Sequence, residues 1–143
     1  MDHNYVNTFI SVAEDTKATA SKEPAPRGAS RTVAQYQYEL LREPFRHTQE
    51  DVLFEVWMAR QGDAGNLAVD ELAPDEIAQL RSDFFAKGQP CLRASPLTKS
   101  HGWGVHFDAE GRAALVAMES DEYRRCQQDG DLTQLKAMRT KRA

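Results

Sequence analysis

The chain has 143 residues, of which 41% are hydrophobic and 28% charged, a composition typical of a single globular domain. Its formal net charge is −4, although the last eight residues carry four basic side chains and no acidic one. An acidic body with a short basic tail argues against a nucleic-acid-binding domain, which carries basic charge over a whole face. No apolar run approaches the roughly 20 residues of a membrane-spanning helix, so no membrane partner is expected.

Cysteine content and the N-terminal sequence predict a reducing compartment. Cys91 and Cys126 are the two cysteines, too few for a disulfide scaffold. The first twelve residues lack the basic region followed by an apolar stretch that marks a secretory signal. We therefore expect a cytoplasmic protein without a Cys91–Cys126 disulfide.

The first predicted element is a strand over residues 8–13, which are rich in β-branched and aromatic side chains. Residues 16–30 contain alanine, serine, proline and charged residues without apolar periodicity, which predicts a flexible loop. A loop of this length is unusual inside a compact domain, so it is either functional or disordered.

Helical spacing of apolar residues follows this loop. Val33, Tyr36 and Leu40 share one face of a predicted helix that Pro44 ends, because the proline ring blocks continuation. A second helix is predicted to begin after Thr48, which can cap it, and to stop at Gly62. Its predicted apolar stripe consists of Val52, Leu53, Val56 and Trp57.

A third helix is predicted from Pro74, a residue favoured in the first helical turn, up to Gly88, a natural terminator. Its predicted buried face consists of Ile77, Leu80, Phe84 and Phe85. After a connecting segment, residues 103–108 alternate in polarity, Gly111 can adopt the positive φ of a turn, and residues 112–118 continue as the returning strand, which predicts a β-hairpin.

The C-terminal part is predicted to be helical. Ser120 can cap one helix and Asp131 another, in which Leu132, Leu135 and Met138 share a face. The sequence therefore predicts an α+β fold in which four to five helices pack on a small antiparallel sheet of about three strands, residues 8–13, 103–108 and 112–118. A single domain covering residues 1–143 is expected.

Separate segments of the chain resemble a family of small bacterial proteins of unknown function. The segments that carry the resemblance are NTFISVAED, HTQEDVLFEV, FFAKGQPCLRASPL, GWGVHFDAEGR and LTQLKAMRTKRA. The resemblance runs from near residue 7 to the C-terminus and is loosest in residues 16–30 and 62–72. It implies a bacterial, soluble, stand-alone protein, and it brings no reaction, cofactor or catalytic residue.

The segment between the third helix and the hairpin is the best candidate for a site, because it combines cationic, thiol, imidazole and hydroxyl side chains. A planar guanidinium such as that of Arg93 binds carboxylate or phosphate groups. We therefore expect a small binding module for an anionic small molecule or peptide. The predicted ligand-binding residues are Lys87, Gln89, Cys91, Arg93, Ser95, Lys99, His101, Trp103 and His106.

Two alternative functions stay open at this point. In the first, an enzyme uses Cys91 as nucleophile and His106 as acid and base, although Cys91 can equally be a small buried side chain and Arg93 can pair with Asp108 or Glu110. In the second, the basic tail contacts a protein or nucleic acid, although it can equally fold back onto the acidic body. The sequence therefore does not decide whether the protein is an enzyme.

No metal or cofactor is predicted. His47, His101 and His106 could be metal ligands together with Cys91. Zinc sites, however, usually contain closely paired ligands, and these residues lack that spacing. No phosphate-binding glycine loop or nucleophile elbow is present either.

Overall fold

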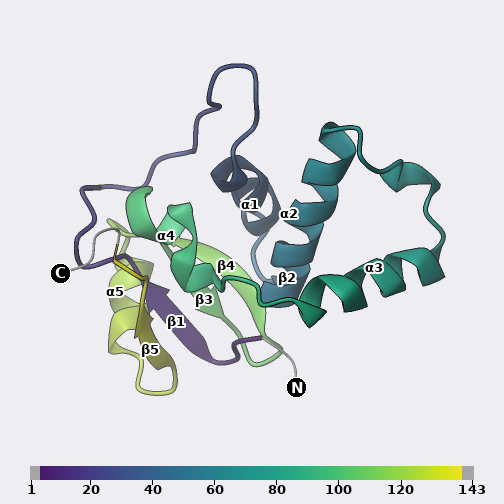
Figure 1. Cartoon of the computed structure of the whole chain (residues 1–143). Helices are drawn as coiled ribbons and strands as arrows, with labels where there is room; N and C mark the ends of the chain where they lie inside the picture. The colour runs from purple at the N-terminus through teal and green to yellow at the C-terminus, as the bar shows by residue number, and fades with distance from the viewer. Residues whose placement is uncertain (1–3, 140–143) are drawn as a thin grey trace.

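The computed structural model describes residues 4–139 and has an α+β fold built on one five-stranded sheet (Figure 1). The strand order is β2-β4-β3-β1-β5, with β1 and β5 parallel and the other neighbours antiparallel. The strands are β1 (Thr8–Ser11), β2 (His47–Thr48), β3 (Trp103–Phe107), β4 (Arg112–Ala117) and β5 (Thr133–Lys136). The predicted α+β class is confirmed. The predicted antiparallel sheet of about three strands is wrong, because the sheet has five strands and β5 runs parallel to β1.

Five α-helices lie within residues 4–139, together with the short 3-10 helices η1 (Val69–Glu71) and η2 (Leu92–Ala94). The α-helices are α1 (Val33–Leu41), α2 (Gln49–Asp63), α3 (Pro74–Ala86), α4 (Pro96–Ser100) and α5 (Asp121–Gln128). Figure 1 shows α5 at one end of the molecule beside β5, and α3 at the opposite end. Every helix of this described part is too short or too polar to cross a bilayer.

The sheet divides the hydrophobic core into two layers, because successive side chains along a strand point to opposite faces. Ile10 and Phe107 are fully buried in the larger layer, which α1, α2 and α4 cover. Phe9 and Val116 point to the other face, where Tyr123 of α5 packs against Phe9 with ring centroids 5.2 Å apart. Residues on one strand therefore serve two separate environments.

The start of α2 confirms the predicted cap. The Thr48 hydroxyl accepts a hydrogen bond from the Asp51 amide at 3.2 Å, and the Asp51 carboxylate accepts one from the Thr48 amide at 3.0 Å. This reciprocal pair satisfies two amides that the helix itself leaves without acceptors. The helix continues through Gly62 to Asp63, so the predicted stop at Gly62 is one residue early.

α3 is attached to the rest of the molecule mainly at its C-terminal half. The Phe84 ring lies 5.8 Å from that of Phe54 and 5.6 Å from that of Trp57, centroid to centroid. Arg81 donates a hydrogen bond to Asp51 at 3.1 Å. The helix, described in full, has no fully buried residue. The predicted buried face is therefore only half-buried, and its members are Ile77, Leu80, Phe84 and Phe85.

The sheet and α5 approach each other most closely at Gly104 of β3. A Cβ atom there would lie 2.7 Å from Cζ of Phe9 and 2.9 Å from Cε2 of Tyr123, closer than non-bonded carbon atoms approach. The absence of a side chain at Gly104 thus lets the Phe9–Tyr123 pair sit directly on the strand.

The predicted C-terminal helix is wrong, because its residues form β5. Thr133–Lys136 pair in parallel with Thr8–Ser11 of β1. Leu132 packs in the layer beneath α5, whereas Leu135 packs in the larger layer, so the two do not share a face. Met138 is 43% exposed. Backbone hydrogen bonds to a strand at the other end of the sequence override the local helical spacing.

The segment between α3 and β3 is not an open connector. It contains η2 and α4, and its side chains Leu92, Leu97 and Thr98 are fully buried. The Thr98 hydroxyl donates to the carbonyl oxygens within the segment, at 3.2 Å for Leu92 and 3.1 Å for Ser95. Much of the predicted site segment therefore belongs to the core.

Candidate functional site

The predicted ligand-binding residues do not line one common cavity. Lys87 and Gln89 line a hollow of about 330 Å³ beside α3, and Cys91 lines a neighbouring hollow of about 410 Å³ that Gln89 also borders. His101 borders a third and larger cavity on a different part of the surface. Lys99 lies on α4 and is half-buried. A role in ligand binding for Lys87, Gln89 and Lys99 stays a prediction.

Cys91 and His106 belong to opposite faces of the sheet. The Cys91 thiol is hydrogen-bonded to Tyr5, whose ring packs on Phe107 at 5.4 Å. The pKa of Tyr5 is raised to about 12, mainly by burial and next by this hydrogen bond. His106 alternates with Phe107 along β3 and faces Cys126, with 3.9 Å between Nδ1 and Sγ. The structure does not bring together the proposed nucleophile and its acid–base partner.

Arg93 is hydrogen-bonded to the C-terminal strand, β5, and to the residue that follows it by two. Its Nε donates a hydrogen bond to the Lys136 carbonyl at 2.7 Å, and its own carbonyl accepts one from the Met138 amide at 2.8 Å. The predicted alternative partner Asp108 instead accepts the amides of Glu110 and Arg112 in the hairpin turn, at 3.0 and 2.8 Å. Arg93 therefore has a structural contact of a kind that the sequence reasoning did not consider.

Ser95 and Trp103 also make structural contacts. The buried Ser95 hydroxyl donates to the Gln37 side chain and accepts the Leu97 amide at the start of α4. The Trp103 indole nitrogen donates to the Lys22 carbonyl at 2.9 Å, which fastens the preceding loop to the end of β3. Both side chains position neighbouring segments.

The described part of the basic tail folds back onto an acidic residue. Lys136 and Arg139 both bind the Glu14 carboxylate at 2.7 Å. These two hydrogen-bonded cations lower the pKa of Glu14 to about 2. The remaining predicted cations of the tail, Lys141 and Arg142, lie outside the described residues.

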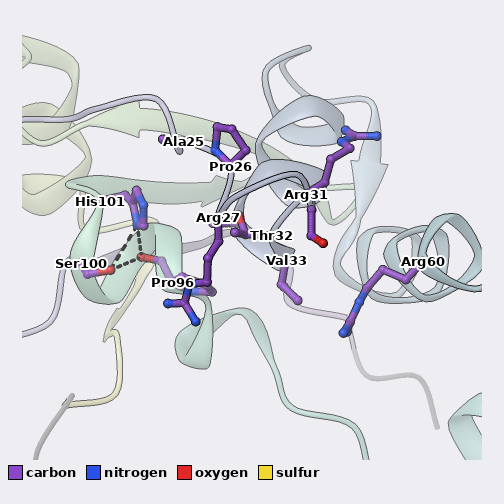
Figure 2. Close-up of a pocket in the computed structure, with 12 residues that line it drawn as sticks. Ala25, Pro26, Arg27, Arg31, Thr32, Val33, Arg60, Pro96, Ser100 and His101 are labelled. Carbon is purple, nitrogen blue, oxygen red and sulfur yellow. Dashed lines mark hydrogen bonds between the residues drawn. The ribbon is translucent and has the colours of Figure 1, made fainter. Parts of the chain in front are cut away.

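A cavity of about 730 Å³ opens between the residue 23–32 loop, the first turn of α1, the end of α2 and α4. Figure 2 shows its lining, and we call it the arginine pocket because three arginines border it. Its lining residues are Ala25, Pro26, Arg27, Ser30, Arg31, Thr32, Val33, Ala34, Arg60, Pro96, Ser100 and His101. Of the predicted ligand-binding residues, only His101 belongs to it.

The loop that forms one wall of the arginine pocket is anchored at its base. The Lys22 amide donates to the His101 carbonyl at 3.0 Å, and Ser21 donates from its amide and hydroxyl to Glu119. Gly102, with φ of +79°, allows this crossing, since a Cβ there would lie 2.5 Å from the Ala20 carbonyl oxygen. Ser21 and Lys22, which precede the pocket-lining residues, are thus bound to Glu119 and to the segment just before β3.

A tight turn presents Arg27 to the pocket. The Arg27 and Ser30 backbones exchange two hydrogen bonds, at 3.1 and 3.2 Å, and Gly28 between them has φ of +64°. A two-residue turn of this kind requires a residue that tolerates positive φ, which glycine does. Thr32 then caps α1 by accepting the Gln35 amide, so the chain passes from the turn directly into the helix.

The three arginines differ in their charge environment. Arg31 pairs with Glu39 and stacks over the Tyr36 ring, with its guanidinium carbon 4.4 Å from the centroid. Within residues 4–139, neither Arg27 nor Arg60 forms an ion pair. In Figure 2, Arg27 lies on the α4 side and Arg60 on the α2 side, whereas Arg31 extends away from both. Two arginines without an ion pair in this part of the chain therefore border one cavity.

His101 adds a polar edge. Its Nδ1 lies 3.0 Å from the Pro96 carbonyl oxygen and 3.1 Å from the Ser100 hydroxyl (Figure 2). Because a carbonyl oxygen only accepts, the Nδ1 in this hydrogen bond carries the proton. The ring is therefore held in a fixed orientation at the rim.

The sequence reasoning missed Arg27, Arg31 and Arg60 as site residues. Arg27 and Arg31 stand at the edge of a proline- and alanine-rich loop, and Arg60 lies on the polar side of a helix. The one available signal was the length of the loop, which suggested a functional segment. Their convergence depends on the packing of α1 against α2, which local patterns do not reveal.

Among the residues that the structure describes, no group of three or more histidine, cysteine, aspartate or glutamate side chains is arranged to hold a metal ion. The comparison with curated proteins finds no match, and neither does the comparison with solved structures. A family of unknown function, DUF6157, matches residues 1–143, the full length of the chain. The chain therefore belongs to this family of unknown function.

Proposed function

We propose that the protein is a small binding module that holds an anionic small molecule in the arginine pocket, with Arg27 and Arg60 as the groups that bind the negative charge. The observation that carries the proposal is that Arg27 and Arg60 line one cavity from opposite sides, each without an ion pair among residues 4–139. A guanidinium offers several donors in a planar arrangement that suits phosphate and carboxylate oxygens.

The first turn of α1 supports the same chemistry. The amides of the first helical residues have no acceptor within the helix, and Val33 and Ala34 at these positions line the pocket. The helix dipole adds partial positive charge at this end. The Thr32 hydroxyl accepts the Gln35 amide, so the Val33 and Ala34 amides are the first-turn donors that this cap leaves without an acceptor.

Binding, as opposed to catalysis, fits the hydroxyl groups of the lining. The Thr32 hydroxyl is engaged as the helix cap, and the Ser100 hydroxyl donates to the Pro96 carbonyl at 3.1 Å. The Ser100 hydroxyl also lies 3.1 Å from His101 Nδ1, but that nitrogen carries its proton in the hydrogen bond to the Pro96 carbonyl and so does not act as a base toward Ser100. The pocket thus offers donors and positive charge, which are the features of an anion-binding site.

A cytoplasmic, bacterial setting belongs to the same proposal. Cys91 and Cys126 are both free thiols, as a reducing compartment favours. The bacterial origin rests on the family resemblance of the sequence.

Calorimetric titration with pyrophosphate and with citrate tests the proposal. We expect saturable binding to the wild-type protein, and a loss of about 10-fold or more in affinity in both Arg27→Ala and Arg60→Ala, since a hydrogen bond to a charged group contributes about 1.5–3 kcal/mol. Binding should also weaken as salt concentration rises.

Arg125→Ala is the matched control, because Arg125 is an exposed arginine on α5 that forms no ion pair in the described structure. It should bind both anions like the wild type. Absence of binding of either anion at millimolar concentration, or an equal loss in Arg125→Ala, would overturn the proposal.

A further inference from the structure

A second hollow, of about 690 Å³, adjoins the arginine pocket and shares Ser30, Arg31 and Arg60 with it. We call it the amide pocket. Its other lining residues are Ala29, Tyr36, Gln61, Asp63, Ala64 and Asn66. Because these residues line both, the two hollows lie side by side, one next to α4 and the start of α1 and the other at the end of α2. Each is within the size range of small-molecule sites, roughly 300–1,000 Å³.

The amide pocket presents hydrogen-bonding groups of both kinds. The Asn66 side-chain nitrogen donates to the Gln61 side-chain oxygen at 3.0 Å, which leaves the Gln61 nitrogen as donor and the Asn66 oxygen as acceptor. One Asp63 carboxylate oxygen accepts the Tyr36 hydroxyl. This hydrogen bond raises the pKa of Tyr36 and so keeps the hydroxyl a donor. The second Asp63 oxygen remains an acceptor.

These groups suit hydroxyl groups better than an ammonium group. An ammonium would be attracted by Asp63 but repelled by Arg31 and Arg60, which border the same hollow. A hydroxyl both donates and accepts, so it matches a carboxylate acceptor next to an amide that offers both roles. It also carries no charge for the arginines to repel.

The geometry points to a ligand that carries a phosphate group in the arginine pocket and a row of hydroxyl groups in the amide pocket, which is the chemistry of a sugar or polyol phosphate. This inference rests on the proposed function, since the arginine pocket must hold the anionic end. It adds that Asp63 and Asn66 recognise the neutral end.

Titrations of the full-length protein with inorganic phosphate, glucose 6-phosphate, ribose 5-phosphate and glycerol 3-phosphate test the inference. We expect at least one of the three esters to bind about 10-fold or more tightly than inorganic phosphate, because its hydroxyls add hydrogen bonds that phosphate alone cannot make. Glucose without phosphate should bind much more weakly than glucose 6-phosphate.

Two variants separate the two pockets. Asn66→Ala should remove most of the preference for the ester while leaving the affinity for inorganic phosphate unchanged. Asp63→Asn should also reduce the preference, yet tighten phosphate binding slightly, because it removes a negative charge near the arginines. Asp83→Ala, on the exposed side of α3, is the control for both and should change neither affinity.

The outcomes distinguish the two proposals. If inorganic phosphate binds in an Arg27-dependent manner but none of the three esters binds more tightly, the inference is overturned and the proposed function stands. If the ester preference persists in Asn66→Ala and Asp63→Asn, the amide pocket is not where the hydroxyls bind, and the inference is again overturned. If no phosphate compound binds and the pyrophosphate and citrate titrations are also negative, both fail.

Discussion

The sheet and α3 both carry regular apolar patterns, yet they are covered to very different extents. Val105 and Phe107 of β3 are at most 1% exposed, because helices lie over them on one side and neighbouring strands flank them. α3 has an equally regular apolar face but no fully buried residue. An apolar period therefore tells which side of an element turns toward other apolar groups, but not how completely those groups cover it.

Replacing one phenylalanine in each region gives the largest contrast. Phe107→Ala should lower the free energy of unfolding by about 3–5 kcal/mol, the range for truncation of a fully buried aromatic side chain. Phe85→Ala on α3 should cost under about 2 kcal/mol, because a half-exposed side chain buries less apolar area. Equilibrium urea unfolding measures both. Equal losses would show that α3 is as tightly integrated as the sheet.

Two glycines make a smaller and sharper comparison. Gly104→Ala should destabilise by about 1–3 kcal/mol, since the new methyl group overlaps the Phe9 and Tyr123 rings. Gly88, just after α3, has open space where a Cβ would be built. Gly88→Ala should therefore stay within about 0.5 kcal/mol of the wild type or be slightly stabilising. A neutral Gly104→Ala, again by urea unfolding, would contradict the tight contact between β3 and α5.

The smallest effect concerns Glu14 at the sheet edge. Its folded-state pKa is lowered from 4.5 to about 2 by Lys136 and Arg139. A lowered pKa stabilises the folded state above the unfolded value, and this contribution is lost as pH falls from about 4.5 through 2. Because the carboxylate is exposed, the effect is small.

The difference in thermal midpoint between wild type and Glu14→Gln should thus be present at pH 7 and disappear near pH 2. Glu110→Gln, an exposed carboxylate without an ion pair among the described residues, is the control and should show no such trend. A pH-independent difference for Glu14→Gln would rule out the proposed ion pairs as its cause.

Much of the fold could be predicted from local signals. The cap at Thr48, the first-turn proline at Pro74 and the turn at Gly111 each have a short-range physical cause, and the structure has all three. The last strand could not be predicted in this way. Leu132, Leu135 and Met138 fit a helical spacing, and only the pairing of Thr133–Lys136 with β1 makes this segment a strand.

The candidate site was less predictable than the fold. Arg27 and Arg60 are far apart in sequence and line one cavity because α1, which follows the Arg27 loop, packs against α2. His101 was singled out from its own loop, and it does border the arginine pocket. Cys91 and His106 appeared close in sequence, but the alternation of side chains along β3 sends His106 to the face opposite Phe107.

The position of β1 between β3 and β5 has a consequence for how the protein is made. β1 leaves the ribosome before its partners, because β3 follows almost a hundred residues later and β5 later still. Until those partners emerge, both edges of β1 have unpaired backbone groups and its apolar side chains Phe9 and Ile10 lack cover. We therefore expect the nascent chain to complete its sheet only after β5 has emerged, with β1 exposed to chaperones until then.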